Sequence, residues 1–156
     1  MVEPGMMMAS YNRILLCYDA THQGRGALRA GAELALELRA ETHLLAVLDD
    51  SGWMQGLDAP AVDMSGIQEH TAREILQQGV ADLASRGVFA RGHLAIGRPI
   101  VQIPLFAEEL NIDLVVVGHQ KRGRLSRWWS GNPDSLLLDH VHCSVLVVVN
   151  DEVRGA

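Results

Sequence analysis

The feature that most constrains the fold is an alternation between short apolar runs and longer stretches with helical spacing. Three of the runs, at 14–18, 44–48 and 114–117, are apolar throughout, which is typical of parallel strands buried on both faces. The run at 88–96 is weaker, which favours a place at or near a sheet edge, and 145–149 is the last strand. We therefore expect an α/β fold with a five-stranded, doubly wound parallel sheet whose crossovers are helices.

Stretches with helical spacing lie between these strands. They cover 21–40, 66–86, 99–110 and, more briefly, 133–140. In the first of them, one apolar face consists of Ala27, Ala30, Gly31, Leu34 and Leu38. A proline begins each of the last two, where its missing N–H would have had no partner in the helix. The segment 49–65 mixes glycine, aspartate and proline, and we expect a long loop there.

Length and composition indicate one domain with its own core. The chain has 156 residues, of which 48% are hydrophobic and 21% are charged. We expect a flexible arm at 1–10, the α/β domain at 11–150 and a short tail at 151–156. The first residues lack the basic start and the long apolar stretch of a secretory signal. No run approaches the roughly 18 apolar residues that a membrane span needs.

Charge and cysteine content exclude several classes of protein. The formal net charge of -6 argues against binding to nucleic acid or to an anionic membrane. The two cysteines, Cys17 and Cys143, are too few for a disulfide scaffold and form no CxxC pair. We therefore expect a cytoplasmic protein, in a reducing compartment, that does not insert into membranes.

The loop after the fourth strand carries the strongest signal for ligand binding. It begins at Gly118, and 4 of the 13 basic residues lie between Lys121 and Arg127. Gly131 and Asn132 follow, and asparagine is a good N-cap for the helix expected next. Unpaired N–H groups at a helix N-terminus can bind a phosphate, which favours a phosphate site here. The same residues are also compatible with a solvated charged loop followed by an ordinary helix cap. The Lys-Ser/Thr pair of a P-loop is absent, which excludes a Walker-type NTPase.

Other candidate sites are weaker. His140, His142 and Cys143 lie close together, but a fourth ligand is missing, His140 suits a helix C-terminus and Cys143 suits the start of a buried strand, so we expect no metal site. Ser126 and Ser130 lack the context of a catalytic triad, and nothing in the sequence positions a general base. Trp128 and Trp129 suit packing of the loop, a partner surface or stacking on a base.

Several short motifs, in the right order along the chain, resemble the universal stress protein family. An aspartate follows each of the first two strands, at Asp19 and Asp49, and a Gly-x-Pro turn lies at 97–99. A strand that ends in glycine lies at 113–118, and the segment 140–149 contains the apolar last strand. The resemblance implies an open α/β sheet with strand order 3-2-1-4-5, usually in a homodimer. Pairing through the last strand is physically reasonable, because an apolar edge otherwise leaves N–H and C=O groups unpaired.

Many members of this family bind ATP through a Gly-x2-Gly-x9-Gly-Ser/Thr motif, whereas another subgroup does not. Gly118 and Gly131 match the first and last glycines at the right separation. Lys121 replaces the middle glycine, and Asn132 replaces the Ser/Thr. A glycine with positive φ, or one that lies close to a phosphate, is poorly replaced by lysine, although lysine adds positive charge.

The resemblance also implies a set of binding residues and a function. Asp19 and Val47 would hold the adenine and ribose, and the phosphates would lie against Gly118, Lys121, Gly131 and Asn132. The implied ligand is ATP, with or without Mg²⁺, in a regulatory or signalling protein of the stress response that hydrolyses ATP slowly at most. The alternative is a dimeric interaction or scaffold protein that binds no nucleotide.

Overall fold

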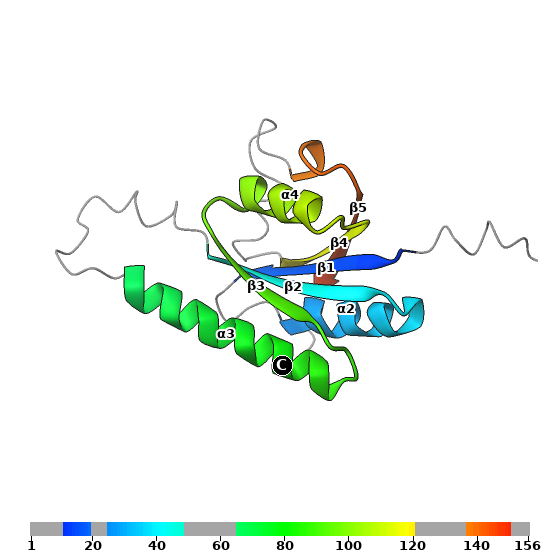
Figure 1. Ribbon diagram of the computed structural model, residues 1–156, viewed down its shortest axis with the longest axis horizontal. Coiled ribbons are helices and arrows are strands. Elements are labelled where there is room, and N and C mark those ends of the chain that lie inside the picture. Colours follow the sequence, from blue (N-terminus) through cyan, green and yellow to red (C-terminus); the bar gives the residue numbers. More distant parts are fainter. Residues whose placement is uncertain (1–10, 20–24, 49–64, 121–136, 151–156) are drawn as a thin grey trace, which may run out of the picture.

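Five parallel strands form one sheet, in the order β3-β2-β1-β4-β5 (Figure 1). The computed structural model describes residues 11–19, 25–48, 65–120 and 137–150. The strands are β1 (Arg13–Asp19), β2 (Glu41–Leu48), β3 (Arg91–Ile96), β4 (Leu114–Gln120) and β5 (Ser144–Asn150). The helices in these ranges are α2 (Arg25–Leu38), α3 (Ser65–Ser85), α4 (Pro99–Glu109) and the 3₁₀ helix η3 (Leu137–Asp139). The α/β class and the strand order implied by the resemblance are confirmed.

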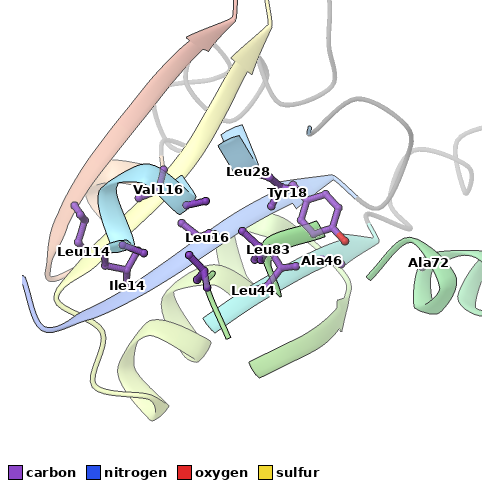
Figure 2. Close-up of a cluster of buried hydrophobic side chains, with 13 residues drawn as sticks. Ile14, Leu16, Tyr18, Leu28, Leu44, Ala46, Ala72, Leu83, Leu114 and Val116 are labelled. Atoms are coloured by element: carbon purple, nitrogen blue, oxygen red, sulfur yellow. The ribbon is translucent and has the colours of Figure 1, made fainter. Parts of the chain in front are cut away.

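Helices cover both faces of the sheet. α2 and α3 lie on one face, and α4 and η3 lie on the other (Figure 1). Side chains alternate between the two faces along each strand. In β1, Ile14, Leu16 and Tyr18 face α2 and α3 (Figure 2), whereas Leu15 and Cys17 face α4. Each of these five side chains is at most 3% exposed, which explains why the run is apolar at every position.

Small residues of α2 bring this helix close to the sheet. Its buried positions are Leu28, Gly31, Ala32 and Ala35. The predicted apolar face is correct at Gly31, and Leu34 and Leu38 are half-buried against the core as expected. Ala30 is only half-buried and lies outside the core cluster, and the side chain of Ala27 lies outside the described residues. Small residues face the strands for a steric reason, because a Cβ on Gly31 would lie 2.5 Å from Cδ2 of Leu16. The small side chains therefore face the strands, and the larger leucines pack at the rim of the core.

α3 and α4 agree more closely with the sequence predictions. α3 buries Leu83, and the chain turns after it at Gly87, whose φ of 89° favours glycine. α4 begins at Pro99, as expected, and buries Ile103 and Ala107 against the opposite face. None of the helices in the described ranges is long and apolar enough to span a membrane.

Several predicted boundaries differ from the observed ones. β3 begins at Arg91 and not at Val88, because the Val88 N–H donates to the Leu83 carbonyl at the end of α3. β4 continues to Gln120, where we expected a loop from Gly118, because 118–120 pair with β5. Of the helix expected at 133–140, the described part is η3, a three-residue 3₁₀ turn. Three expected segments lie outside the described residues: the arm at 1–10, the tail at 151–156 and most of the long loop, at 49–64.

One carboxylate ties the amino edge of the sheet together. Asp113, just before β4, accepts hydrogen bonds from the N–H groups of Asn12, at 2.8 Å, and of Arg13, at 3.0 Å. Its own N–H donates to the Arg13 carbonyl at 3.1 Å. These bonds fix the stagger of β1 against β4, on which the arrangement at the opposite edge depends.

Candidate functional site

The strand order reverses between β1 and β4. The chain places β2 and β3 on one side of β1, and then crosses to place β4 and β5 on the other side. In open α/β sheets, ligands bind in the crevice beyond the carboxyl ends of the strands at such a reversal. The carboxyl ends of β1 and β4 are therefore the candidate site.

Three of the residues implied by the resemblance meet at this edge. Asp19 ends β1, and the strand register places it opposite Val47 of β2. Cys17 of β1 pairs with Val117 of β4, so Gly118 lies beside the end of β1. These residues are far apart in the sequence, and the register of the parallel strands brings them together.

Val47 does not present its side chain at the surface. It is 1% exposed, and it packs in the core that α4 covers. Gly118 is also buried, and it lies opposite Val148 of the edge strand β5. Val47 could therefore contact a ligand only through its main chain, while its side chain packs in the core beneath the candidate site.

The remaining residues implied for the phosphates are Lys121, Gly131 and Asn132, which lie outside the described residues. Trp128 and Trp129 also lie outside them. The structure thus brings Asp19, Val47 and Gly118 to one edge, while the arrangement of the other three residues stays a prediction.

A turn to which the sequence analysis gave no binding role lies at the same edge. The N–H of Gly97 donates to the carbonyl of Leu48, at the end of β2, over 2.9 Å. Gly97 has a φ of 139°, a conformation that side chains rarely adopt. The Arg98 carbonyl then accepts the first N–H bonds of α4, from Val101 at 3.0 Å and Gln102 at 2.9 Å. The Gly-x-Pro spacing was the sequence signal for this turn, which holds the start of α4 against the candidate site.

Cys17 and Tyr18, two described residues next to the edge, are not activated nucleophiles. Burial raises the pKa of the Cys17 thiol above its ordinary range, and nearby Cys143 raises this pKa further. Burial also raises the pKa of Tyr18, whose hydroxyl donates a 2.8 Å hydrogen bond to the Ile75 carbonyl on α3. Both groups are protonated at neutral pH, so their roles here are structural.

The two histidines considered as metal ligands lie elsewhere. His140 and His142 line a groove of about 400 Å³ on the outer side of α4, together with Arg98 and Glu108. Across the described ranges, no three His, Cys, Asp or Glu side chains are grouped so that they could hold a metal ion.

Comparison with known proteins gives one family. The profile described as the Universal stress protein family matches residues 10–149. A universal stress protein of Staphylococcus haemolyticus is 26% identical over 151 residues, which cover 94% of this chain and 89% of that protein.

Solved structures share the fold. A universal stress protein in complex with cAMP has a TM-score of 0.63 at 15% identity, over 91% of this chain and 99% of that chain. The universal stress protein from Archaeoglobus fulgidus in complex with dAMP has a TM-score of 0.62 at 20% identity, over 88% of this chain and 98% of that chain. At these identities the likeness establishes the fold alone. The match of the family profile from residue 10 to 149 shows that the chain belongs to the universal stress protein family.

Proposed function

We propose that this chain binds an adenine nucleotide at the carboxyl ends of β1 and β4, and that it serves as a regulatory module in the stress response. The observation that carries the proposal is the register that brings Asp19 and Gly118 to one edge where the strand order reverses. Ligands of open α/β sheets bind at such a place. We assign the adenine and ribose side of the site to Asp19 and Val47.

The phosphates, in this proposal, lie beside the end of β4. Gly118 has no side chain to keep a phosphate away, and Lys121 supplies positive charge. Gly131 and Asn132 would lead into a helix N-terminus, where unpaired N–H groups favour anions. We expect ATP to be the ligand, with or without Mg²⁺.

Two related proteins support an adenine ligand. Those proteins were solved with cAMP and with dAMP, and each ligand combines the adenine base with a single phosphate. The two ligands differ at the ribose and in whether the phosphate forms a ring. The shared chemistry is the base, which is consistent with the assignment of the base to the edge at Asp19 and Val47.

Isothermal titration calorimetry tests the proposal. We expect dialysed protein to bind ATP and AMP saturably, to bind GTP far more weakly, and to lose adenine nucleotide binding in Asp19→Ala. Asp82→Ala is the matched control, because Asp82 pairs with Arg86 on α3, away from the candidate site. The proposal is wrong if neither adenine nucleotide binds and if the denatured preparation releases no carried-over nucleotide.

The altered phosphate motif is tested by restoring the family pattern. We expect the double variant Lys121→Gly with Asn132→Ser to bind ATP no more tightly than the natural chain, because Lys121 supplies charge to the phosphates. A large gain in ATP affinity would instead mean that the natural motif has degenerated, which favours the scaffold function.

A dimeric interaction protein is the second candidate function, and the exposure of β5 favours it. β5 pairs with β4 on one side, and it is the last strand of the sheet in the described part of the chain. Leu146 and Val147 of this strand are 42% and 37% exposed. Antiparallel pairing of two β5 strands would cover these side chains and satisfy the open edge. This homodimer is compatible with nucleotide binding but does not require it.

Sedimentation velocity at micromolar concentration tests the dimer. We expect the natural chain to be dimeric and Val147→Lys to be monomeric, because a lysine on an edge strand opposes strand pairing. Leu36→Lys is the control, since Leu36 is 49% exposed on α2, outside the proposed interface. A natural chain that sediments as a monomer would contradict this proposal and leave the nucleotide proposal untouched.

We assign the protein to the cytoplasm and expect no fast chemistry. Cys17 and Cys143 are free thiols, which suits a reducing compartment. The buried thiol and phenol nearest the edge, those of Cys17 and Tyr18, offer no general base. Phosphate release from ATP should therefore proceed close to the rate without protein, and rapid multiple turnover would contradict this assignment.

A further inference from the structure

Two histidines form a hydrogen bond on the sheet face that α4 covers. Nδ1 of His43, in β2, lies 3.0 Å from Nε2 of His93, in β3. Their rings stack with centroids 5.2 Å apart. His43 is 2% exposed, and among the residues whose side chains are described it is the only buried histidine, lysine, arginine, aspartate or glutamate. A pair of titratable rings therefore lies where the core is otherwise apolar.

Glu41 and Phe106 flank the histidine pair. Oε1 of Glu41 lies 3.0 Å from Nε2 of His43, the nitrogen that does not contact His93. The Phe106 ring of α4 is tilted against the His93 ring, with centroids 5.7 Å apart. Glu41 and His93 thus lie on different sides of the His43 ring and do not converge on one point, as metal ligands must. The contacts instead form a line from a carboxylate at the sheet edge to the covering helix.

Only one hydrogen fits between the two rings. When His43 donates Nε2–H to Glu41, its neutral ring accepts at Nδ1, and His93 donates Nε2–H to it. A first added proton leaves this bond in place, because one imidazolium and one imidazole still share a hydrogen. The Glu41 carboxylate balances that charge. A second added proton sets two N–H groups against each other over 3.0 Å, so the rings must separate.

We propose that Glu41, His43 and His93 form an acid-responsive contact that loosens α4 from the sheet when both imidazoles are protonated. His93 is the ring that moves, because it is only half-buried whereas His43 is enclosed. Its movement toward solvent removes the contact with Phe106 and weakens the packing of α4. The other face of the sheet keeps its contacts with α2 and α3.

The surroundings of His93 oppose the second proton. Burial lowers the pKa of His93 below its ordinary value of 6.5, and the charges of His43 and Arg91 lower it further. When the pKa of a histidine is lower in the folded than in the unfolded chain, the neutral ring stabilises the fold. This stabilisation is complete at pH values above the pKa of the unfolded chain. This stability is lost as the pH falls through the folded value. The contact is therefore intact at neutral pH and weakens below about 6.5.

The other charged groups near the pair come from the strands. The hydrogen bond with His43 lowers the pKa of Glu41, and Arg13, whose Nε lies 3.5 Å from that carboxylate, lowers it too. Glu41 therefore stays ionised while the histidines take up protons. From α4 the facing group is the apolar ring of Phe106. None of the ion pairs in the described part of the chain joins an α4 carboxylate, Glu108 or Glu109, to either histidine.

Hydrogen exchange at two pH values tests the proposal. Between about pH 7.5 and about pH 5, we expect the protection factors of α4 amides to fall by roughly fivefold relative to those of α2, about the factor that corresponds to the net contribution of one hydrogen bond. His93→Gln should abolish this fall, because glutamine keeps a hydrogen-bonding group but takes up no proton. His70→Gln, which removes a 75% exposed histidine of α3, is the control and should keep it. Equal protection changes in α4 and α2, or an unchanged fall in His93→Gln, would overturn the proposal.

A titration of the natural chain covers the case in which His93→Gln does not fold. Imidazole ¹⁵N resonances report the protonation of each ring. We expect the second proton to enter the pair below pH 6.5 and the α4 amide signals to change over the same range. Two rings that titrate independently at their ordinary value, with no change in α4, would show the proposal to be wrong.

Discussion

Replacing Gly31 by alanine tests how closely α2 packs on the sheet. A Cβ at this position would lie 2.5 Å from Cδ2 of Leu16, 2.9 Å from its Cδ1 and 3.2 Å from its Cγ. Ordinary contacts between carbon atoms are about 3.5–4.0 Å. The Leu16 methyl group must therefore shift by about 1 Å to reach that distance, in a side chain that is only 2% exposed.

The size of the effect follows from two opposing contributions. Overpacking of a core destabilises by about 1–3 kcal/mol, whereas alanine is about 1 kcal/mol better than glycine inside a helix. We expect Gly31→Ala to lower the free energy of unfolding by about 1 kcal/mol net. Leu16→Ala lowers it by about 2–5 kcal/mol and removes all three close carbons. In that background Gly31→Ala should stabilise by about 1 kcal/mol, so the coupling between the two sites is about 2 kcal/mol.

Urea unfolding of the natural chain, the two single variants and the double variant measures this coupling. Far-ultraviolet circular dichroism follows the helices, and the midpoints give the differences at equal slope. The predicted result is a change of sign for Gly31→Ala between the two backgrounds. The packing argument is refuted if Gly31→Ala has the same effect in both.

Three other outcomes follow from single contacts. Tyr18→Phe should lower the free energy of unfolding by about 1 kcal/mol, because the Ile75 carbonyl keeps its helical partner; a loss above about 3 kcal/mol in urea unfolding would contradict this reading. Asp113→Ala should lower it by about 2–3 kcal/mol, because two main-chain N–H groups at the start of β1 lose their side-chain acceptor, and a thermal midpoint equal to that of the natural chain would contradict that role. An aromatic disulfide reagent should label Cys143 slowly in the native protein and Cys17 only on unfolding, whereas equal rates would mean that Cys17 is accessible.

Much of the fold is predictable because its central strands are buried on both faces. The continuous apolar runs of β1, β2 and β4 leave few alternatives, and residues such as Leu16 and Val116 occupy the positions that this pattern predicts. The face of α2 is predicted only in part, because periodicity does not decide which alanine beside Gly31 is buried: Ala32 is 1% exposed, whereas Ala30 is half-buried. The start of β3 is also missed, since Val88 is buried by a turn after α3 and not by a strand.

The candidate site is predictable in its position more than in its detail. Asp19 and Gly118 were implied by a resemblance, and the strand register brings them to one edge. The apolar run at 44–48 predicts the burial of Val47, whereas the face on which its side chain packs, under α4, is not predictable from that run. The pair of His43 and His93 had no signal in the sequence, because its geometry depends on the register of strands 50 residues apart.

Chemical-shift mapping with ATP tests the proposed nucleotide site most directly. Titration of ¹⁵N-labelled protein should shift most strongly the amides at the carboxyl ends of the strands, at 17–19, 47–48 and 117–120. The amino edge, with Asn12 and Asp113, is an internal control that should not respond. The account predicts saturable shifts confined to the carboxyl edge between β1 and β4. Shifts centred on the amino edge, or none at saturating ATP, would contradict it.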